Sequence, residues 1–216
     1  MLKYQSLRFI FIVFWFLAGF STALSQKAKP VQVSLFSPLQ IVKKDYSIHG
    51  IRLNLIYGVN EDMNGVDAGF INQTNGTQRG VQWGIVNIGK ENFYGFRYGW
   101  INLLDYHFHG LSTGGININK GNADGWISGA VNVVLGKVQG VLSGGINVMQ
   151  GDYFSGLQLG AINIIDPDKI QPGNNKGVQI GLFNYATSLR GVQFGLININ
   201  RSAKIKFFPI LLISRK

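Results

Sequence analysis

GVQIGLFNYATSLRGVQFGLININ, which runs from Gly177 to Asn200, contains nearly the same unit twice. Each copy reads glycine, apolar residue, glutamine, apolar residue, a second glycine and, at its eighth position, asparagine. The whole unit returns after 14 residues. A unit this short cannot bury a core by itself, so its recurrence predicts an array in which neighbouring copies stack on one another.

The same unit extends through most of the chain. Its leading glycines are spaced by 15 residues from Gly50 through Gly140, and then by 16, 21 and 14 residues, which makes ten copies. The first copy lacks the second glycine and the asparagine, and the 21-residue step contains an insertion at 166–176, DPDKIQPGNNK, whose prolines and glycine indicate a surface loop. The glycines and asparagines that define the repeat, and that we predict to be structural, are Gly65, Asn72, Gly80, Asn87, Gly95, Asn102, Gly110, Asn117, Gly125, Asn132, Gly140, Asn147, Gly156, Asn163, Gly177, Asn184, Gly191 and Asn198.

The unit has the pattern of β-strands. With the leading glycine as position one, apolar residues alternate with period two at positions two and four, seven and nine, and twelve and fourteen. Successive pairs are offset by five residues, which predicts three short strands per 15-residue turn, with glycines near the corners. We therefore expect an all-β fold of tandem repeats, a parallel β-solenoid. In such a stack the asparagine amides of successive turns can hydrogen-bond along the axis.

An up-and-down outer-membrane β-barrel is the alternative fold. If each unit is one strand, the ten units together with 30–42 and 204–214 give about 12 strands, the even number that such barrels have. Neighbouring strands of a barrel run in opposite directions, however, so its natural period would be two units. The single-unit period favours the solenoid.

The amino terminus is typical of an exported protein. Lys3 and Arg8 precede the apolar run FIFIVFWFLAGF, and small residues follow it, which predicts a signal peptide over 1–25. The remaining chain divides into an N-terminal entry or cap strand at 26–49, the repeat array at 50–200, and a C-terminal cap strand with a basic tail at 201–216. The sequence has no cysteine, so disulfides and a lipid-modified cysteine are excluded.

The positive charge lies at the ends of the chain. The formal net charge is +10, but 50–200 contains nine basic and nine acidic residues. A nucleic-acid-binding protein would have a basic stripe along its working face, so we expect no nucleic-acid partner. Basic ends suit anionic head groups of the envelope, and they serve equally as solubilising charge.

A few residues have side chains that suit metal binding. His107 and His109 flank Phe108 and lie near Asp105, and two imidazoles at this spacing can hold a transition metal. Oxygen ligands for calcium also occur, but without the spacing of a calcium loop. Those oxygen ligands are Glu61, Asp62, Asn64, Asp67, Asp166 and Asp168. We find no catalytic triad, paired carboxylates or phosphate loop, and we predict no enzyme activity, no cofactor and no metal.

SLFSPLQI (34–41), GIRLNLIYGVN (50–60), the GVQ-x-G-x-x-N units and FFPI (207–210) resemble the bacterial surface repeat-containing proteins of the leptospiral type. Similar repeats occur in Bacteroidetes envelope proteins. The resemblance implies an exported protein of the outer membrane or cell surface. It implies no reaction, cofactor or ligand.

We therefore expect a non-enzymatic, exported surface or envelope repeat protein with a structural or adhesive role. The expected partners are outer-membrane or envelope components, with a host or matrix ligand as a further possibility. Binding is expected at position three and in the connections, on Gln/Asn-rich faces, while Trp83, Tyr98, Trp100 and Trp126 are interpreted as core or membrane-facing packing. The alternative function, a pore or scaffold, belongs to the barrel.

Overall fold

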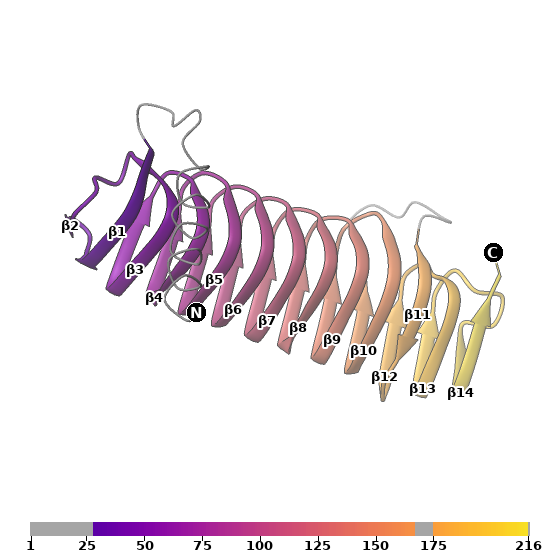
Figure 1. Ribbon diagram of the computed structural model, residues 1–216. Coiled ribbons are helices and arrows are strands. Elements are labelled where there is room, and N and C mark those ends of the chain that lie inside the picture. The colour runs from indigo at the N-terminus through magenta and orange to yellow at the C-terminus, as the bar shows by residue number, and fades with distance from the viewer. Residues whose placement is uncertain (1–27, 167–174, 216) are drawn as a thin grey trace, which may run out of the picture.

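The computed structural model describes residues 28–166 and 175–215. The predicted signal peptide and most of the predicted insertion lie outside the described residues. The described chain is all-β and forms one sheet that winds through about 11 turns of a β-solenoid (Figure 1). The strands are β1 (Ala28–Phe36), β2 (Leu39–Gln40), β3 (Ser47–Asn60), β4 (Met63–Thr74), β5 (Gln78–Gly89), β6 (Phe93–Leu104), β7 (Phe108–Asn119), β8 (Ala123–Val134), β9 (Val138–Met149), β10 (Phe154–Ile165), β11 (Lys176–Ile180), β12 (Phe183–Ala186), β13 (Arg190–Asn200) and β14 (Phe207–Ser214).

Successive turns pair in parallel and in register with the repeat. Between β4 and β5, for example, Gly65 pairs with Gly80 and Asn72 with Asn87. The same register continues through β10, and after the insertion β11 and β12 together take the place of one strand against β10 and β13. Because these pairings are parallel, the fold is the predicted solenoid, and the alternative antiparallel barrel is wrong.

The turns of β4 to β10 each contain one long strand, so the expectation of three short strands is wrong. Strands β4 to β10 have 12 residues each, followed by a short connection. The strand bends at positions six and seven, where two successive side chains point outward, as Ile85 and Val86 do in β5. The hydrogen-bonded ladder resumes directly after the bend, so the glycines at position five mark a bend and no strand end.

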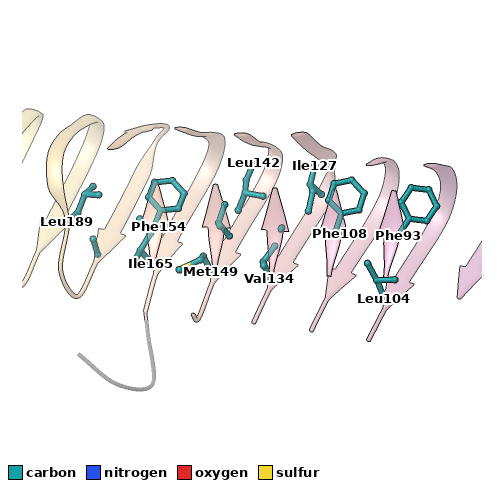
Figure 2. Packing of buried hydrophobic residues seen from close by; sticks show 13 residues of the cluster. Phe93, Leu104, Phe108, Ile127, Val134, Leu142, Met149, Phe154, Ile165 and Leu189 are labelled. Carbon is teal, nitrogen blue, oxygen red and sulfur yellow. The ribbon is translucent and has the colours of Figure 1, made fainter. Parts of the chain in front are cut away.

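Side chains at positions three, five, eight, ten and fourteen face the interior. The apolar part of this interior runs along the axis, with Phe93 and Phe108 at position fourteen stacked at a ring-centroid distance of 5.8 Å. Leu104 and Val134 supply the opposite wall from position ten (Figure 2). The solenoid therefore has a thin apolar core that is continuous from turn to turn.

Both ends of the stack have additional strands. At the N-terminal end β1 pairs in parallel with β3 and adds a turn before the first recognised repeat. At the C-terminal end β14 pairs antiparallel with β13. The antiparallel strand occupies the edge where a further turn would otherwise stack, and unpaired edges of this kind are sites of unwanted strand addition.

Candidate functional site

The repeat asparagines form a continuous hydrogen-bonded ladder inside the solenoid. From Asn72 to Asn198, each Nδ2 donates to the Oδ1 of the asparagine in the next turn at 2.8–3.0 Å. The second hydrogen of each Nδ2 reaches a backbone carbonyl of the next turn, as from Asn87 to the carbonyl of Tyr98 at 2.8 Å. Asn54 of the degenerate first copy donates to Asn72 at 2.7 Å and so begins the ladder. The asparagines from Asn72 to Asn198 are buried and hydrogen-bonded, and they are unavailable to a ligand.

Glycine occurs at position five because the ladder occupies the adjacent space. A Cβ built on Gly84 would overlap the amides of Asn72 and Asn87. At position one the reason is different: Gly80 has φ +111°, and a Cβ there would overlap the carbonyl oxygen of Gly65. The two glycines of the unit therefore belong to the architecture.

Position three is buried, so its interpretation as a binding surface is wrong. Arg52 and Asp67 form a bidentate ion pair at 2.6–2.7 Å, and both side chains are fully buried. Farther along, the glutamines at position three stack: Gln179 donates to Gln158 at 2.7 Å. A period-two pattern defines two faces of a strand but not which one is interior. Here stacked polar side chains satisfy one another along the axis, which makes their burial possible.

Arg97, at position three of its turn, is less well paired than Arg52. Its guanidinium has only long hydrogen bonds, 3.4 Å to the Ser112 hydroxyl and 3.4 Å to the Leu103 carbonyl, and it lies over the rings of Phe93 and Phe108. Burial lowers the pKa of Arg97 from its ordinary value to about 9. Two aromatic faces stabilise the cation in part, but no carboxylate among the described residues hydrogen-bonds to it.

The candidate metal ligands do not converge. His107 Nδ1 accepts a hydrogen bond from the backbone of Asn122 and its ring lies against Tyr106, whereas His109 lies against Tyr94. The acidic candidates have separate partners: Asp67 pairs with Arg52, Asp62 accepts from Thr77, and Asp166 accepts from Thr187. Asp168 lies outside the described residues. Within 28–166 and 175–215, no three His, Cys, Asp or Glu side chains are grouped to hold a metal ion.

Positions eleven to thirteen and the last position of each unit, which we call the turn edge, carry the accessible charge of the array. Lys90, Asp105 and Lys120, which occupy equivalent places in three successive turns, form a row of ion pairs with N–O distances of 3.0 and 2.7 Å. Hydrogen bonds from Lys120 and Lys90 lower the pKa of Asp105. This row is solvent-exposed, so it adds little to stability.

The opposite side of each turn has no charge. We define the outer face as the outward residues at positions two, four, six, seven and nine of the turns from Gly50 to Asn200. Among the described residues, charged side chains of these turns are either interior, as Arg52, Asp67 and Arg97 are, or lie at the turn edge. Those at the turn edge are Glu61, Asp62, Arg79, Lys90, Glu91, Asp105, Lys120, Asp124, Lys137, Asp152, Asp166, Lys176 and Arg190.

Large apolar side chains cover much of this outer face. Trp83, Trp100 and Trp126 are 64%, 69% and 51% exposed, and Tyr98 is also exposed, so none of the four belongs to the core. Exposed apolar residues of this size, continuous over many turns, indicate a contact surface. The alternation and the aromatic residues were visible in the sequence, but only the direction of the side chains distinguishes a core from a contact face.

Comparison of the chain with protein-family models, curated proteins and solved structures finds no match. In the described part of the chain, no helix has the length and apolar character needed to cross a membrane. The fold and the ladder define the class: this is a β-solenoid repeat protein with a polar ladder inside and an uncharged apolar face outside.

Proposed function

We propose that this chain is a non-enzymatic, exported repeat protein of the bacterial envelope or cell surface with a structural or adhesive role. The outer face is its working surface, and its partners are outer-membrane or envelope components. The observation that carries the proposal is the segregation of side chains. Polar groups in the interior hydrogen-bond to one another, and the accessible outer face offers apolar contact along many turns. Multiple equivalent contacts on one rigid scaffold give avidity even when each contact is weak.

Other observations are consistent with this role. The expected signal peptide and the resemblance to surface repeat proteins support export to the envelope. Asp62, Asp67 and Asp166 have partners within the chain, and the ladder asparagines from Asn72 to Asn198 are satisfied, so neither group supports a catalytic role. The outer face also lacks the basic stripe that a nucleic-acid partner would require.

Binding of the exported chain to outer-membrane vesicles, lipopolysaccharide and matrix proteins tests the proposal. We expect the unmodified chain to bind one of these. The double variant Ile180→Glu/Phe194→Glu should bind at least tenfold more weakly, because both residues are exposed at position four and carboxylates there oppose apolar contact. Sedimentation with vesicles and surface plasmon resonance give the two readouts.

Leu135→Glu is the matched control, since Leu135 is an exposed apolar residue at the turn edge. It should bind as the unmodified chain does. A chain that fractionates away from the envelope in cells and binds none of the three materials would contradict the proposal.

A further inference from the structure

The bend of each turn places one side chain, at position six, on a ridge that runs along the solenoid. In the turns of β3 to β6 this residue is large: Leu55, Phe70, Ile85 and Trp100, which are 48–69% exposed. In the turns of β7 to β10 it is small: Gly115, Ala130, Gly145 and Ala161. Over these eight turns the ridge therefore consists of four large residues followed by four small ones, and the last two turns carry large residues again, Leu182 and Leu196.

A hollow lies where the ridge changes from large to small residues, and another of about 290 Å³ lies among the large residues Leu55, Phe70 and Ile85. The first hollow has a volume of about 280 Å³, and its walls include Tyr98 and Trp100 on one side and Thr113 and Gly115 on the other. Trp100 therefore stands over a low, uncharged shelf formed by the next four turns.

We propose that a second copy of this chain occupies that shelf, packed antiparallel about a two-fold axis that passes between β6 and β7 perpendicular to the stack. The axis places each of the four large residues opposite one of the four small ones. The pairs are Trp100 with Gly115, Ile85 with Ala130, Phe70 with Gly145, and Leu55 with Ala161. This inference rests on the proposed role of the outer face as an interaction surface.

The order of sizes along the ridge supports this register. Both aromatic residues meet glycine and both aliphatic residues meet alanine, so each pair has similar summed volume. Because both copies have the same spacing between turns, ~4.8 Å, a match at one pair places every other pair in register. A two-fold interface buries the same patch on both subunits, which requires this kind of self-complementarity.

The residues at position four near the axis also pair a large side chain with a small one. The same axis places Tyr98 opposite Thr113 and Trp83 opposite Ser128, again large against small. The outer two position-four pairs, Ala68 with Ser143 and Leu53 with Leu159, do not follow the rule, so the fit is closest near the axis. Position seven contributes apolar residues throughout these turns, and no outward charge opposes contact.

The extent of the surface suits a stable dimer. Three outward positions on each of eight turns give 3 × 8 = 24 residues per subunit, within the range of about 20–30 per side found in specific interfaces. A lipid surface is fluid and adapts to any outline, so it would not require large residues to be matched with small ones.

Paired cysteines test the register directly, because the chain has none of its own. Ile85→Cys/Ala130→Cys should give a disulfide-linked dimer under a mild oxidant. The two sites lie three turns apart in one chain, about 14 Å, which is too far for an internal disulfide. Ile85→Cys/Ala161→Cys is the mismatched control and should stay uncrosslinked.

Substitutions that change the size of ridge side chains test the contact itself, with dimerisation measured by analytical ultracentrifugation. Ala130→Trp should weaken dimerisation at least tenfold, because two large residues then oppose each other, and β6 already carries tryptophan at this position. Adding Ile85→Gly should restore the dimer by recreating a Trp–Gly pair. Leu135→Trp, which places the same residue at the turn edge and away from the ridge, should dimerise normally.

A monomer at about 100 μM, equal crosslinking of the matched and mismatched pairs, or a monomer that binds neutral phosphatidylcholine vesicles through the ridge would each overturn the dimer. Envelope binding that persists in such a monomer would overturn only this inference and leave the proposed function standing. A chain that dimerises as expected but binds no envelope or matrix material would contradict the proposed function alone.

Discussion

At the residue scale, position three shows how differently two buried arginines can contribute to stability. Arg52 donates to both oxygens of Asp67, to the Gln73 carbonyl and to the Thr74 hydroxyl. In 28–166 and 175–215, Arg97 has no carboxylate partner and only long hydrogen bonds. A buried charge that lacks a good partner raises the free energy of the folded state, whereas removal of one member of a buried pair leaves the other uncompensated.

Substitution by glutamine, which several other turns carry at position three, should therefore have opposite effects at the two sites. Arg97→Gln should raise the free energy of unfolding by about 1–3 kcal/mol, and Arg52→Gln should lower it by about 3–5 kcal/mol. Urea unfolding at pH 7, followed by far-ultraviolet circular dichroism, measures both. Equal destabilisation by the two variants would contradict the distinction.

The lowered pKa of Arg97 predicts a pH dependence. Above about pH 9, the pKa of Arg97 in the folded chain, and below its much higher ordinary pKa, the unfolded chain holds a proton that the folded chain has lost. Stability attributable to this group therefore rises with pH above about 9, and the cost of the buried charge is fully present at neutral pH. The stability difference between Arg97→Gln and the natural chain should consequently shrink from pH 7 to pH 10.5. An unchanged difference would show that Arg97 stays charged.

At the element scale, the asparagine ladder links each strand to the next by side-chain hydrogen bonds on the inner side of the bend. Asn117 donates to Asn132 and to the Ser128 carbonyl, and it accepts from Asn102 and from Ser112. It is therefore a donor and an acceptor in the middle of the stack, with every bond buried or partly buried.

Removal of one asparagine from the middle of the ladder should lower the free energy of unfolding. Asn117→Ala leaves the Asn102 donor and the Asn132 acceptor unpaired, so we expect a loss of about 2–6 kcal/mol, two unsatisfied buried groups at about 1–3 kcal/mol each. Thermal and urea unfolding measure the loss. Asn122→Ala is the control: its Oδ1 accepts one exposed hydrogen bond from the Lys137 backbone, and its loss should cost about 0.5–1 kcal/mol. A loss at Asn117 no greater than that at Asn122 would contradict a stabilising ladder.

At the scale of the whole molecule, every turn is amphipathic in cross-section, with charge at the turn edge and apolar residues at the bend. Because each turn contacts its neighbours alone, stability is distributed along the stack. Turns should therefore be removable as units, provided that the register of glycines, asparagines and interior positions is retained.

Deletion of 125–139, one complete turn, should leave a folded solenoid in which Asn117 donates to Asn147. The rod should shorten by one strand spacing, ~4.8 Å, which small-angle X-ray scattering can detect as a change in the longest dimension. Deletion of 125–132 removes only part of a turn, places polar and apolar positions out of register, and should give an unfolded or aggregated chain. A folded product from the second deletion would contradict the dependence on register.

The sequence determined the repeat, the parallel stack and the roles of the glycines and asparagines as structural residues, because a single-unit period requires every copy to have the same environment. Gly84, for instance, leaves room for the amide of Asn72 in the preceding turn and for that of Asn87 in its own turn. Tertiary structure decided which face of the strand is interior. The period-two pattern is symmetric between the faces, and only the winding of the chain brings Gln158 and Gln179 into contact, which turns expected surface polar residues into a buried stack. The same winding places Trp100 and Gly115 next to each other on the outside, where their difference in size becomes a feature of the surface.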